Sequence, residues 1–269
     1  MEGTWTRIAL RAWVVLILLF LFIPIVLIFF YAFNTSIIES WPIPGLTTKW
    51  FGATWNDENV RSALWLSVQA ALGATAIALV LGSCAAFAVH RTQFFGREVV
   101  SLLFVLPLAL PGIITGVSLN AFFSFNGIFL SLFTIVVGHA TFCIVVVYNN
   151  VLARLRRTQG SLLEAAMDLG ANGFQTFRDI TLPLISTSVV SGAILAFALS
   201  FDEVIVTTFT AGSQSTLPIW ILGQIRHGSL LPEVNVVVSF VILVTIIPVV
   251  VAARLTGGSG AARVVPREL

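Results

Sequence analysis

The chain has 269 residues, of which 58% are hydrophobic and only 10% are charged. Soluble globular domains carry about 25% charged residues, so this composition excludes that class and indicates a membrane protein. The formal net charge of +2 gives no reason to expect nucleic acid as a partner.

Six apolar runs are long enough to cross a lipid bilayer, which takes about 20 residues of helix. None of them alternates apolar and polar residues as a barrel strand does. We therefore expect helices, whose backbone groups satisfy one another within lipid. The expected fold is all-α, a polytopic membrane protein with six transmembrane helices in a single domain over residues 1–269. The predicted spans cover approximately residues 12–33, 62–89, 99–125, 127–153, 182–211 and 234–253.

Basic residues predict the orientation of the chain. If the N-terminus lies inside, all but three of the 14 Lys and Arg residues fall on the inner side, the exceptions being Lys49, Arg61 and Arg226. Because basic loops favour the cytoplasmic side, both termini are expected in the cytoplasm. The first run, residues 12–33, is longer than the apolar core of a signal peptide, which has about 7–15 residues, so we expect it to remain as a span.

A long polar excursion between the first two spans carries Trp41, Trp50 and Trp55. Tryptophan rings are common at the level of the lipid headgroups, which favours an interfacial anchor. A docking surface for an external partner is the alternative.

The third span contains the sequence LPLALPGIITG, in which Pro107, Pro111 and Gly112 stand close together. Each proline removes a backbone donor and disfavours a straight helix. Broken helices occur at membrane depth where they line a cavity or are buried against neighbouring helices. The three residues are therefore candidates for a kink that lines and gates a pathway, with a packing kink as the alternative.

The fourth span carries His139, the one histidine inside a predicted span. A packing histidine with satisfied nitrogens is the simpler expectation, and a proton relay is the alternative. Cys84 and Cys143 both fall within apolar spans, so the sequence indicates neither a disulfide framework nor a metal site.

The segment between the fourth and fifth spans, approximately residues 158–183, is expected on the inner side of the membrane. Ser161 followed three residues later by Glu164 is typical of a helix start, and Gly170 and Gly173 would end or bend that helix. Acids occupy its polar face, whereas membrane-surface helices are usually rich in Lys and Arg. A docking site for a protein partner is therefore favoured over a membrane-surface helix.

This segment resembles the cytoplasmic signature of the permease subunits of type I ABC importers. The signature reads E-A-A, three residues, G, nine residues, I, one residue, L-P, and every spacing is matched. The matching residues are Glu164, Ala165, Ala166, Gly170, Ile180, Leu182 and Pro183. The resemblance implies a coupling helix that docks into a groove of an ATP-binding subunit, with Met167 also in the contact.

The resemblance extends over nearly the whole chain and is greatest to the second, shorter permease of the spermidine/putrescine type. It implies a bacterial inner-membrane (plasma-membrane) protein that imports a polyamine. The implied partners are an ABC ATPase dimer, a second permease that forms a heterodimer with this chain, and an extracytoplasmic solute-binding protein. Gly112 stands where many polyamine permeases have an acid. Another organic cation, a metal chelate or an inorganic anion is therefore the alternative substrate.

The chain itself is expected to have no catalytic residues and to hold no cofactor or metal. A P-loop needs a lysine in a glycine-rich motif, and the only lysine, Lys49, lies in an outer loop. ATP and Mg²⁺ would therefore bind to the partner ATPase.

Asp202 and Glu203 interrupt the apolar run of the fifth span. A buried anion needs a counter-charge, hydrogen-bond donors or a proton, and no Lys or Arg lies inside a predicted span. A permeating cation would supply the missing charge, so both acids are candidates for the substrate path. In a continuous helix Asp202 would lie about 27 Å along the axis from Leu184, near the edge of the membrane core, so a wetted outer interface is the alternative.

Two other classes fit parts of the sequence. A stand-alone ion-coupled carrier would account for buried acids and kinks, but it gives no reason for the signature between Glu164 and Pro183. An intramembrane hydrolase would need acid–base machinery around His139, and no serine–glycine or metal-ligand pattern accompanies that residue.

Overall fold

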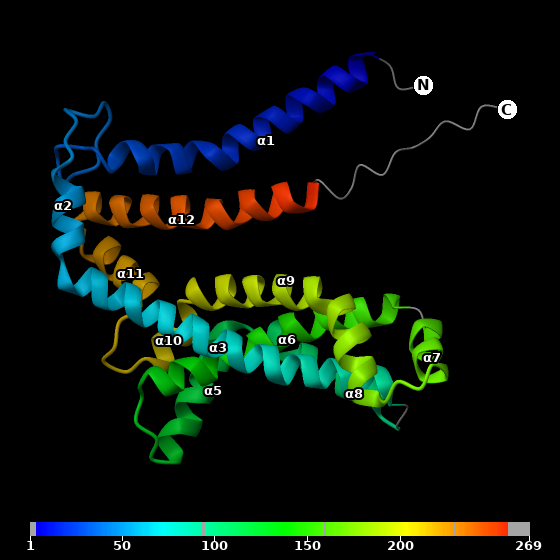
Figure 1. Ribbon diagram of the computed structural model, residues 1–269. Helices are drawn as coiled ribbons and strands as arrows, with labels where there is room; N and C mark the ends of the chain where they lie inside the picture. The colour runs from blue at the N-terminus through cyan, green and yellow to red at the C-terminus, as the bar shows by residue number, and fades with distance from the viewer. Residues whose placement is uncertain (1–3, 93–94, 159, 229, 258–269) are drawn as a thin grey trace. The chain divides into compact units, whose positions relative to one another are not determined.

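The computed structural model describes residues 4–92, 95–158, 160–228 and 230–257, with side chains described as far as Ile246. Every regular element in this part of the chain is a helix, and one isolated bridge joins Asn34 and Leu46. The prediction of an all-α fold is confirmed for these residues. The chain divides into two compact units, which we call the terminal unit, Met1–Glu58 with Ile221–Leu269, and the central unit, Asn59–Trp220 (Figure 1).

The terminal unit is built from α1 (Thr4–Tyr31), α2 (Lys49–Asn56) and α12 (Leu231–Gly257), and α12 packs against both other helices. Ala32, Trp50 and Val236 form its buried apolar cluster. The indole N–H of Trp50 donates to the carbonyl oxygen of Asn34 at 2.7 Å, which anchors α2 to the loop after α1.

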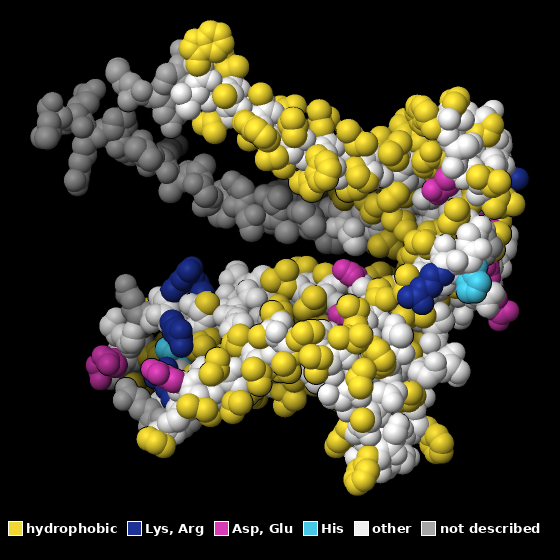
Figure 2. Space-filling model, turned by 180° about the vertical axis from the view of Figure 1, so that it is seen from behind, with side chains coloured by type: hydrophobic (Ala, Val, Ile, Leu, Met, Phe, Trp, Pro, Cys, Tyr) yellow, Lys and Arg dark blue, Asp and Glu magenta, His cyan; other side chains and the backbone are white. Residues whose placement is uncertain are grey.

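Hydrophobic side chains are exposed along most of α1, as Figure 2 shows. The most apolar 18-residue window of the run Trp5–Tyr31 has a mean hydropathy of 3.2, and none of that window is buried within the chain. Such a surface is stable in contact with lipid or with another protein chain, which agrees with a membrane span.

The central unit holds most of the helices. α3 (Glu58–Arg91) begins at its boundary, and α11 (Leu217–His227) runs across the boundary at its other end. Between them lie α4 (Arg97–Ala109), α5 (Gly112–Phe125), α6 (Leu132–Arg157), α7 (Gly160–Asp168), α8 (Gly173–Thr176), the π-helix η1 (Phe177–Thr181), α9 (Leu182–Phe201) and α10 (Ile205–Thr210).

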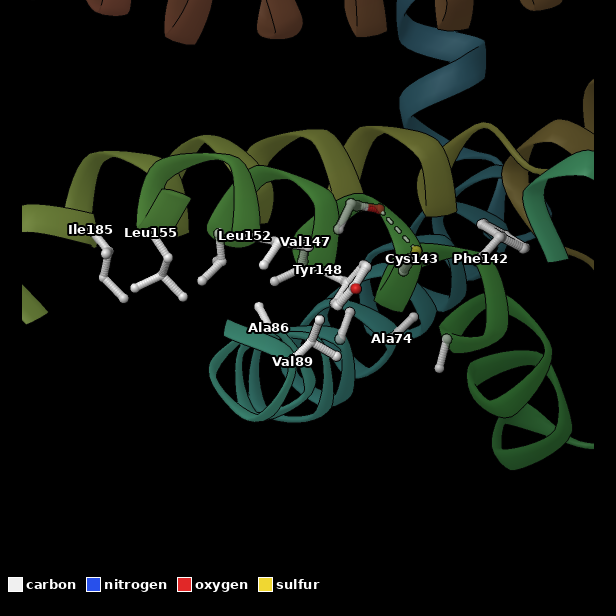
Figure 3. Packing of buried hydrophobic residues seen from close by; sticks show 14 of the residues in the cluster. Ala74, Ala86, Val89, Phe142, Cys143, Val147, Tyr148, Leu152, Leu155 and Ile185 are labelled. Atoms are coloured by element: carbon white, nitrogen blue, oxygen red, sulfur yellow. Dashed lines mark hydrogen bonds between the residues drawn. The ribbon is translucent and has the colours of Figure 1, made fainter. Parts of the chain in front are cut away.

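The core of the central unit lies around α6, which packs against α9 and whose buried side chains meet those of α3 (Figure 3). Small residues on α3, among them Ala74, Ala78 and Gly82, let α6 approach closely, as is common between membrane helices. A Cβ atom at Gly82 would lie 2.9 Å from the carbonyl oxygen of Ile144. Glycine is therefore required at this helix crossing.

Four helical runs in the described chain are long and apolar enough to cross a membrane alone: Trp5–Tyr31, Glu58–Arg91, Leu132–Arg157 and Gly173–Phe201. Helices α4 and α5 meet the criterion only together, with a bend of 100° between them. The predicted span 234–253 lies in α12, whose described apolar stretch, Leu231–Ile246, is shorter. Two predicted spans, 99–125 and 182–211, are thus broken rather than continuous, and the single-domain organisation remains a prediction.

Candidate functional site

Asp202 and Glu203 lie in a break between two helices, not within one continuous helix as the sequence suggests. α9 ends at Phe201, and α10 begins at Ile205. The Glu203 side chain helps to make the break, because its Oε1 accepts a hydrogen bond from the backbone N–H of Val206 at 2.9 Å. A carboxylate at the start of a helix replaces the missing backbone acceptors and interacts favourably with the helix dipole.

The second broken span bends at Leu110 and Pro111. Both residues have extended backbone angles, with ψ of 138° and 130°. Proline lacks the N–H for the helical ladder and disfavours the helical conformation of the preceding residue, so α4 ends here. The carbonyl oxygen of Pro111 then accepts from the N–H of Ile114 at 2.9 Å, and α5 begins at Gly112.

The two breaks belong to one site, because α10 packs against α5. Gly116 of α5 makes room for Phe209, whose ring would lie 2.6 Å from a Cβ atom at this position. The side-chain amide of Asn120 donates to the carbonyl oxygen of Phe209 at 2.6 Å. These contacts fix the short helix α10 beside the bent span.

A cavity of about 210 Å³ lies where the two breaks meet. Its lining residues are Pro107, Leu108, Leu110, Gly112, Thr115, Phe142, Leu199, Glu203 and Val206. Glu203 is the only charged residue among these described lining residues. The site therefore offers one carboxylate within an apolar wall, an arrangement that can bind a cation carrying an apolar segment.

The residues selected from the sequence divide between this cavity and its surroundings. Glu203, Pro107 and Gly112 line the cavity, whereas Pro111 makes the bend without lining it. Asp202 is exposed and lies outside the lining. Within the described residues, neither Asp202 nor Glu203 forms an ion pair.

Six of the lining residues were not selected from the sequence, and two of them, Phe142 and Thr115, have side chains that are not purely aliphatic. Phe142 belongs to α6 and presents an aromatic side chain to the cavity. Thr115 has a buried hydroxyl oxygen with no hydrogen-bond partner among the described residues. Such a group is rare in proteins and costly to leave unsatisfied, so Thr115 is a candidate ligand contact.

The coupling segment, residues 158–183, forms α7, α8 and η1. α7 ends in a left-handed turn at Gly170, where φ is +84°, and Gly170 N–H donates to the carbonyl oxygen of Met167 at 2.9 Å. This is the usual way in which a glycine closes a helix. Ser161 lies inside α7, which begins at Gly160, so the cap expected at Ser161 is not formed.

A capping box at the start of α8 was not predicted from the sequence. Asn172 accepts a hydrogen bond from the N–H of Gln175 at 2.9 Å, and the Gln175 side chain accepts from the N–H of Asn172 at 2.8 Å. This reciprocal pair starts α8, and the π-helix η1 connects α8 to α9.

The signature residues have two different environments. Glu164 and Ala165 are exposed on α7, as is the neighbouring Met167, and Ala166 is buried. Ile180 is half-buried in η1, and exposed Leu182 and Pro183 begin α9. The first group forms an open surface, and the second leads from that surface into the membrane helix.

The surface around α7 also exposes large apolar side chains. Leu169 is 89% exposed and Phe174 is 71% exposed. Figure 2 shows charged side chains gathered at this end of the central unit, while apolar side chains cover the adjoining helices. Exposed apolar groups beside charged ones are typical of a surface that binds another protein.

Contacts within the central unit hold η1 and the start of α9 to the other helices. The Nε–H of Arg154, near the end of α6, donates to the carbonyl oxygen of Leu184 in α9 at 2.9 Å. The rings of Phe87 in α3 and Phe177 in η1 meet edge to face, with centroids 5.5 Å apart. These contacts tie the start of α9 to α6 and η1 to α3. No cluster of His, Cys, Asp and Glu in the described residues could hold a metal ion.

Comparison with known proteins defines the class. The chain belongs to the family of binding-protein-dependent transport system inner membrane components, which matches residues 78–257. Its fold is similar to that of a chain in the crystal structure of a bacterial ABC transporter involved in the import of the acidic polysaccharide alginate. The structural alignment has a TM-score of 0.68 and 17% sequence identity, and it covers 93% of this chain and 98% of the other. The protein is thus a multi-pass inner-membrane permease subunit with the type I ABC importer fold.

Individual relatives are similar over most of their length. The spermidine/putrescine transport system permease protein PotC of Escherichia coli K12 is 35% identical over 239 residues, which cover 88% of this chain and 89% of the relative. PotC of Shigella flexneri is 34% identical over 248 residues, 90% of this chain and 92% of the relative. The putrescine transport system permease protein PotI of E. coli K12 is 34% identical over 243 residues, 86% and 85% of the two chains.

Proposed function

We propose that this protein is a permease subunit of an ATP-driven importer that moves a polyamine, spermidine or putrescine, into the cytoplasm. The observation that carries the proposal is the single Glu203 carboxylate in a mostly apolar cavity between the two broken spans. The names of the relatives, PotC and PotI, agree with a polyamine as substrate.

The chemistry of the cavity suits a polyamine. An ammonium group would pair with Glu203, and the methylene segment would contact the apolar wall formed by Leu108, Leu199 and Val206. The Phe142 ring can add cation–π attraction to an ammonium group that has lost water. One carboxylate binds a cation without holding it permanently, as transport requires.

The energy would come from a partner ATPase dimer, which would bind ATP and Mg²⁺. The exposed signature residues Glu164, Ala165 and Gly170 would form the docking surface together with Met167, and buried Ala166 would pack beneath them. Ile180, Leu182 and Pro183 would connect this surface to α9. Because the break at Glu203 lies at the other end of α9, a shift of the coupling segment could open or close the cavity.

The remaining partners complete the proposal. A second permease chain would form the other half of the pathway, and a solute-binding protein would deliver the substrate from outside. Both termini and the coupling segment would lie in the cytoplasm, with the loop between α1 and α3 on the outer side.

A transport assay with defined components tests this proposal. This chain is expressed together with a partner ATPase, a second permease and a solute-binding protein in cells that lack their own polyamine importers, and uptake of radiolabelled spermidine and putrescine is measured. Saturable uptake that requires both this chain and an ATPase is expected. Unlabelled diamines should compete for uptake, whereas inorganic anions and metal chelates should not. Uptake without an attached ATPase, or competition only by anions or chelates, would contradict the proposal.

A further inference from the structure

His139 joins the two halves of the broken fifth span. It projects from α6 and is only 1% exposed. Its Nδ1 lies 2.7 Å from the hydroxyl oxygen of Ser200, in the last turn of α9, and its Nε2 lies 2.8 Å from the hydroxyl oxygen of Thr207 in α10. Both hydroxyl-bearing residues are buried. The imidazole ring therefore bridges the helix break in which Glu203 lies.

The hydrogen atoms of this bridge can be assigned. The Thr207 hydroxyl has one hydrogen, and it donates that hydrogen to the backbone carbonyl oxygen of Glu203 at 2.6 Å. Toward His139, Thr207 can only accept, so the ring carries its hydrogen on Nε2. In a neutral ring Nδ1 is then the acceptor, and the Ser200 hydroxyl donates to it.

The bridge acts on the backbone of Glu203 itself. Thr207 connects the His139 ring to the Glu203 carbonyl, while the Glu203 carboxylate accepts from the N–H of Val206. One of these bonds fixes the backbone carbonyl oxygen of Glu203, and the other fixes its carboxylate. Hydrogen bonds from neighbouring groups commonly fix the orientation of a functional side chain.

We infer that His139 is a positioning residue: by bonding Ser200 and Thr207 across the break between α9 and α10, it sets the direction in which Glu203 faces the cavity. His139 does not itself line the cavity. The effect of this positioning on transport rests on the proposed function, whereas its effect on the geometry of the break does not.

A labelling experiment tests the geometry without any transport. Glu203→Cys is made in the full complex, in a chain whose own cysteines are replaced by Cys84→Ala and Cys143→Ala. The rate of reaction with a small charged thiol reagent is compared with and without His139→Leu. Because the break would lose its bridge, the rate is expected to change by about fivefold or more.

A matched control comes from the same pair of helices. Thr134→Val removes the buried hydrogen bond from Thr134 of α6 to the carbonyl oxygen of Thr210 in α10, at 2.7 Å, together with the bonds between Thr134 and Ser131 that cap the start of α6, all away from the break. The labelling rate is expected to change by less than about twofold with this variant. An unchanged rate with His139→Leu, or an equal change with Thr134→Val, overturns the inference.

Two further variants cover the case in which His139→Leu does not assemble. Ser200→Ala and Thr207→Val each remove one arm of the bridge and should shift the labelling rate in the same direction by smaller amounts. His139→Gln keeps one donor and one acceptor and should label almost like the parent chain. Failure of both single-arm variants to shift the rate also overturns the inference.

Transport kinetics separate positioning from a merely structural role. His139→Leu is expected to lower the efficiency of uptake about tenfold, chiefly through a higher KM, and His139→Gln should restore most of it. In the double variant with Glu203→Gln, the loss should be no greater than with Glu203→Gln alone. Additive losses overturn the inference.

If the intact complex carries no polyamine, the proposed function fails, and the labelling rates still decide whether His139 positions residue 203.

Discussion

Asp202 and Glu203 are neighbours in the sequence, yet Glu203 lines the cavity and Asp202 is exposed outside it. The helix break causes the difference. The N–H of Asp202 still bonds to the carbonyl oxygen of Ala198 in α9, whereas the Glu203 side chain turns to the N–H of Val206 in α10. A cation in the cavity would therefore meet one carboxylate of the two.

This difference predicts unequal effects of neutralising the two acids. Glu203→Gln removes the charge of the cavity and is expected to lower polyamine uptake at least about tenfold, since a hydrogen bond to a charged group contributes about 1.5–3 kcal/mol. Asp202→Asn, the matched control, should lower uptake by less than about twofold. Uptake at equal amounts of assembled complex measures both effects. Equal losses would show that Glu203 has no special part in the pathway.

Because the hydroxyl of Thr115 has no partner in the described residues, removing it should affect substrate affinity but not the stability of the protein. Thr115→Val keeps the shape of the side chain and removes a buried polar group without a partner, so the melting temperature should stay the same or rise slightly. If the hydroxyl contacts the substrate, the KM of uptake should increase about threefold to tenfold. Thermal unfolding in detergent and uptake kinetics give the two values. A lower melting temperature with unchanged KM would argue against a ligand contact.

The left-handed turn at Gly170 predicts a role in coupling. Gly170→Val places a β-branched residue at a φ of +84°. Glycine adopts this angle without strain because it has no Cβ atom, whereas a β-branched L-residue is strongly strained there. The turn after α7 should shift, and ATP hydrolysis should lose most of its stimulation by substrate-loaded binding protein. ATPase and uptake rates in reconstituted vesicles measure this coupling.

Gly173 offers the control for that experiment. A Cβ atom at Gly173 would meet no atom within 4 Å, and its φ is not positive. Gly173→Ala should therefore preserve coupled ATPase and uptake rates. If Gly170→Val retains full coupling, the turn is not part of the docking surface.

The close approach of α3 and α6 predicts a loss of stability. At Gly82, the Cβ of an alanine would lie 2.9 Å from the backbone oxygen of Ile144, so the helices would have to separate. Gly82→Ala is expected to cost about 1–3 kcal/mol and to lower the melting temperature by several degrees. Gly52→Ala in α2, where no atom lies within 4 Å, should leave the melting temperature unchanged or raise it slightly. Similar melting temperatures for the two variants would contradict the packing of α3 on α6.

Local sequence patterns predicted much of this protein. Apolar runs of sufficient length predicted membrane helices, because an isolated span in lipid must satisfy its own backbone. The seven signature positions between Glu164 and Pro183 indicated the importer family, which the match over residues 78–257 confirms. The positive φ at Gly170 is likewise a local property, since glycine closes helices in this way.

The sequence alone determined the class of protein and its helical fold, because hydropathy and motif spacing act over a few neighbouring residues. Only the tertiary structure decided that the fifth span breaks at Glu203 and that Glu203 shares a cavity with Thr115 and Phe142. It also decided that His139 bridges that break. These features depend on contacts between residues far apart in the chain, and such contacts form only when the helices pack together.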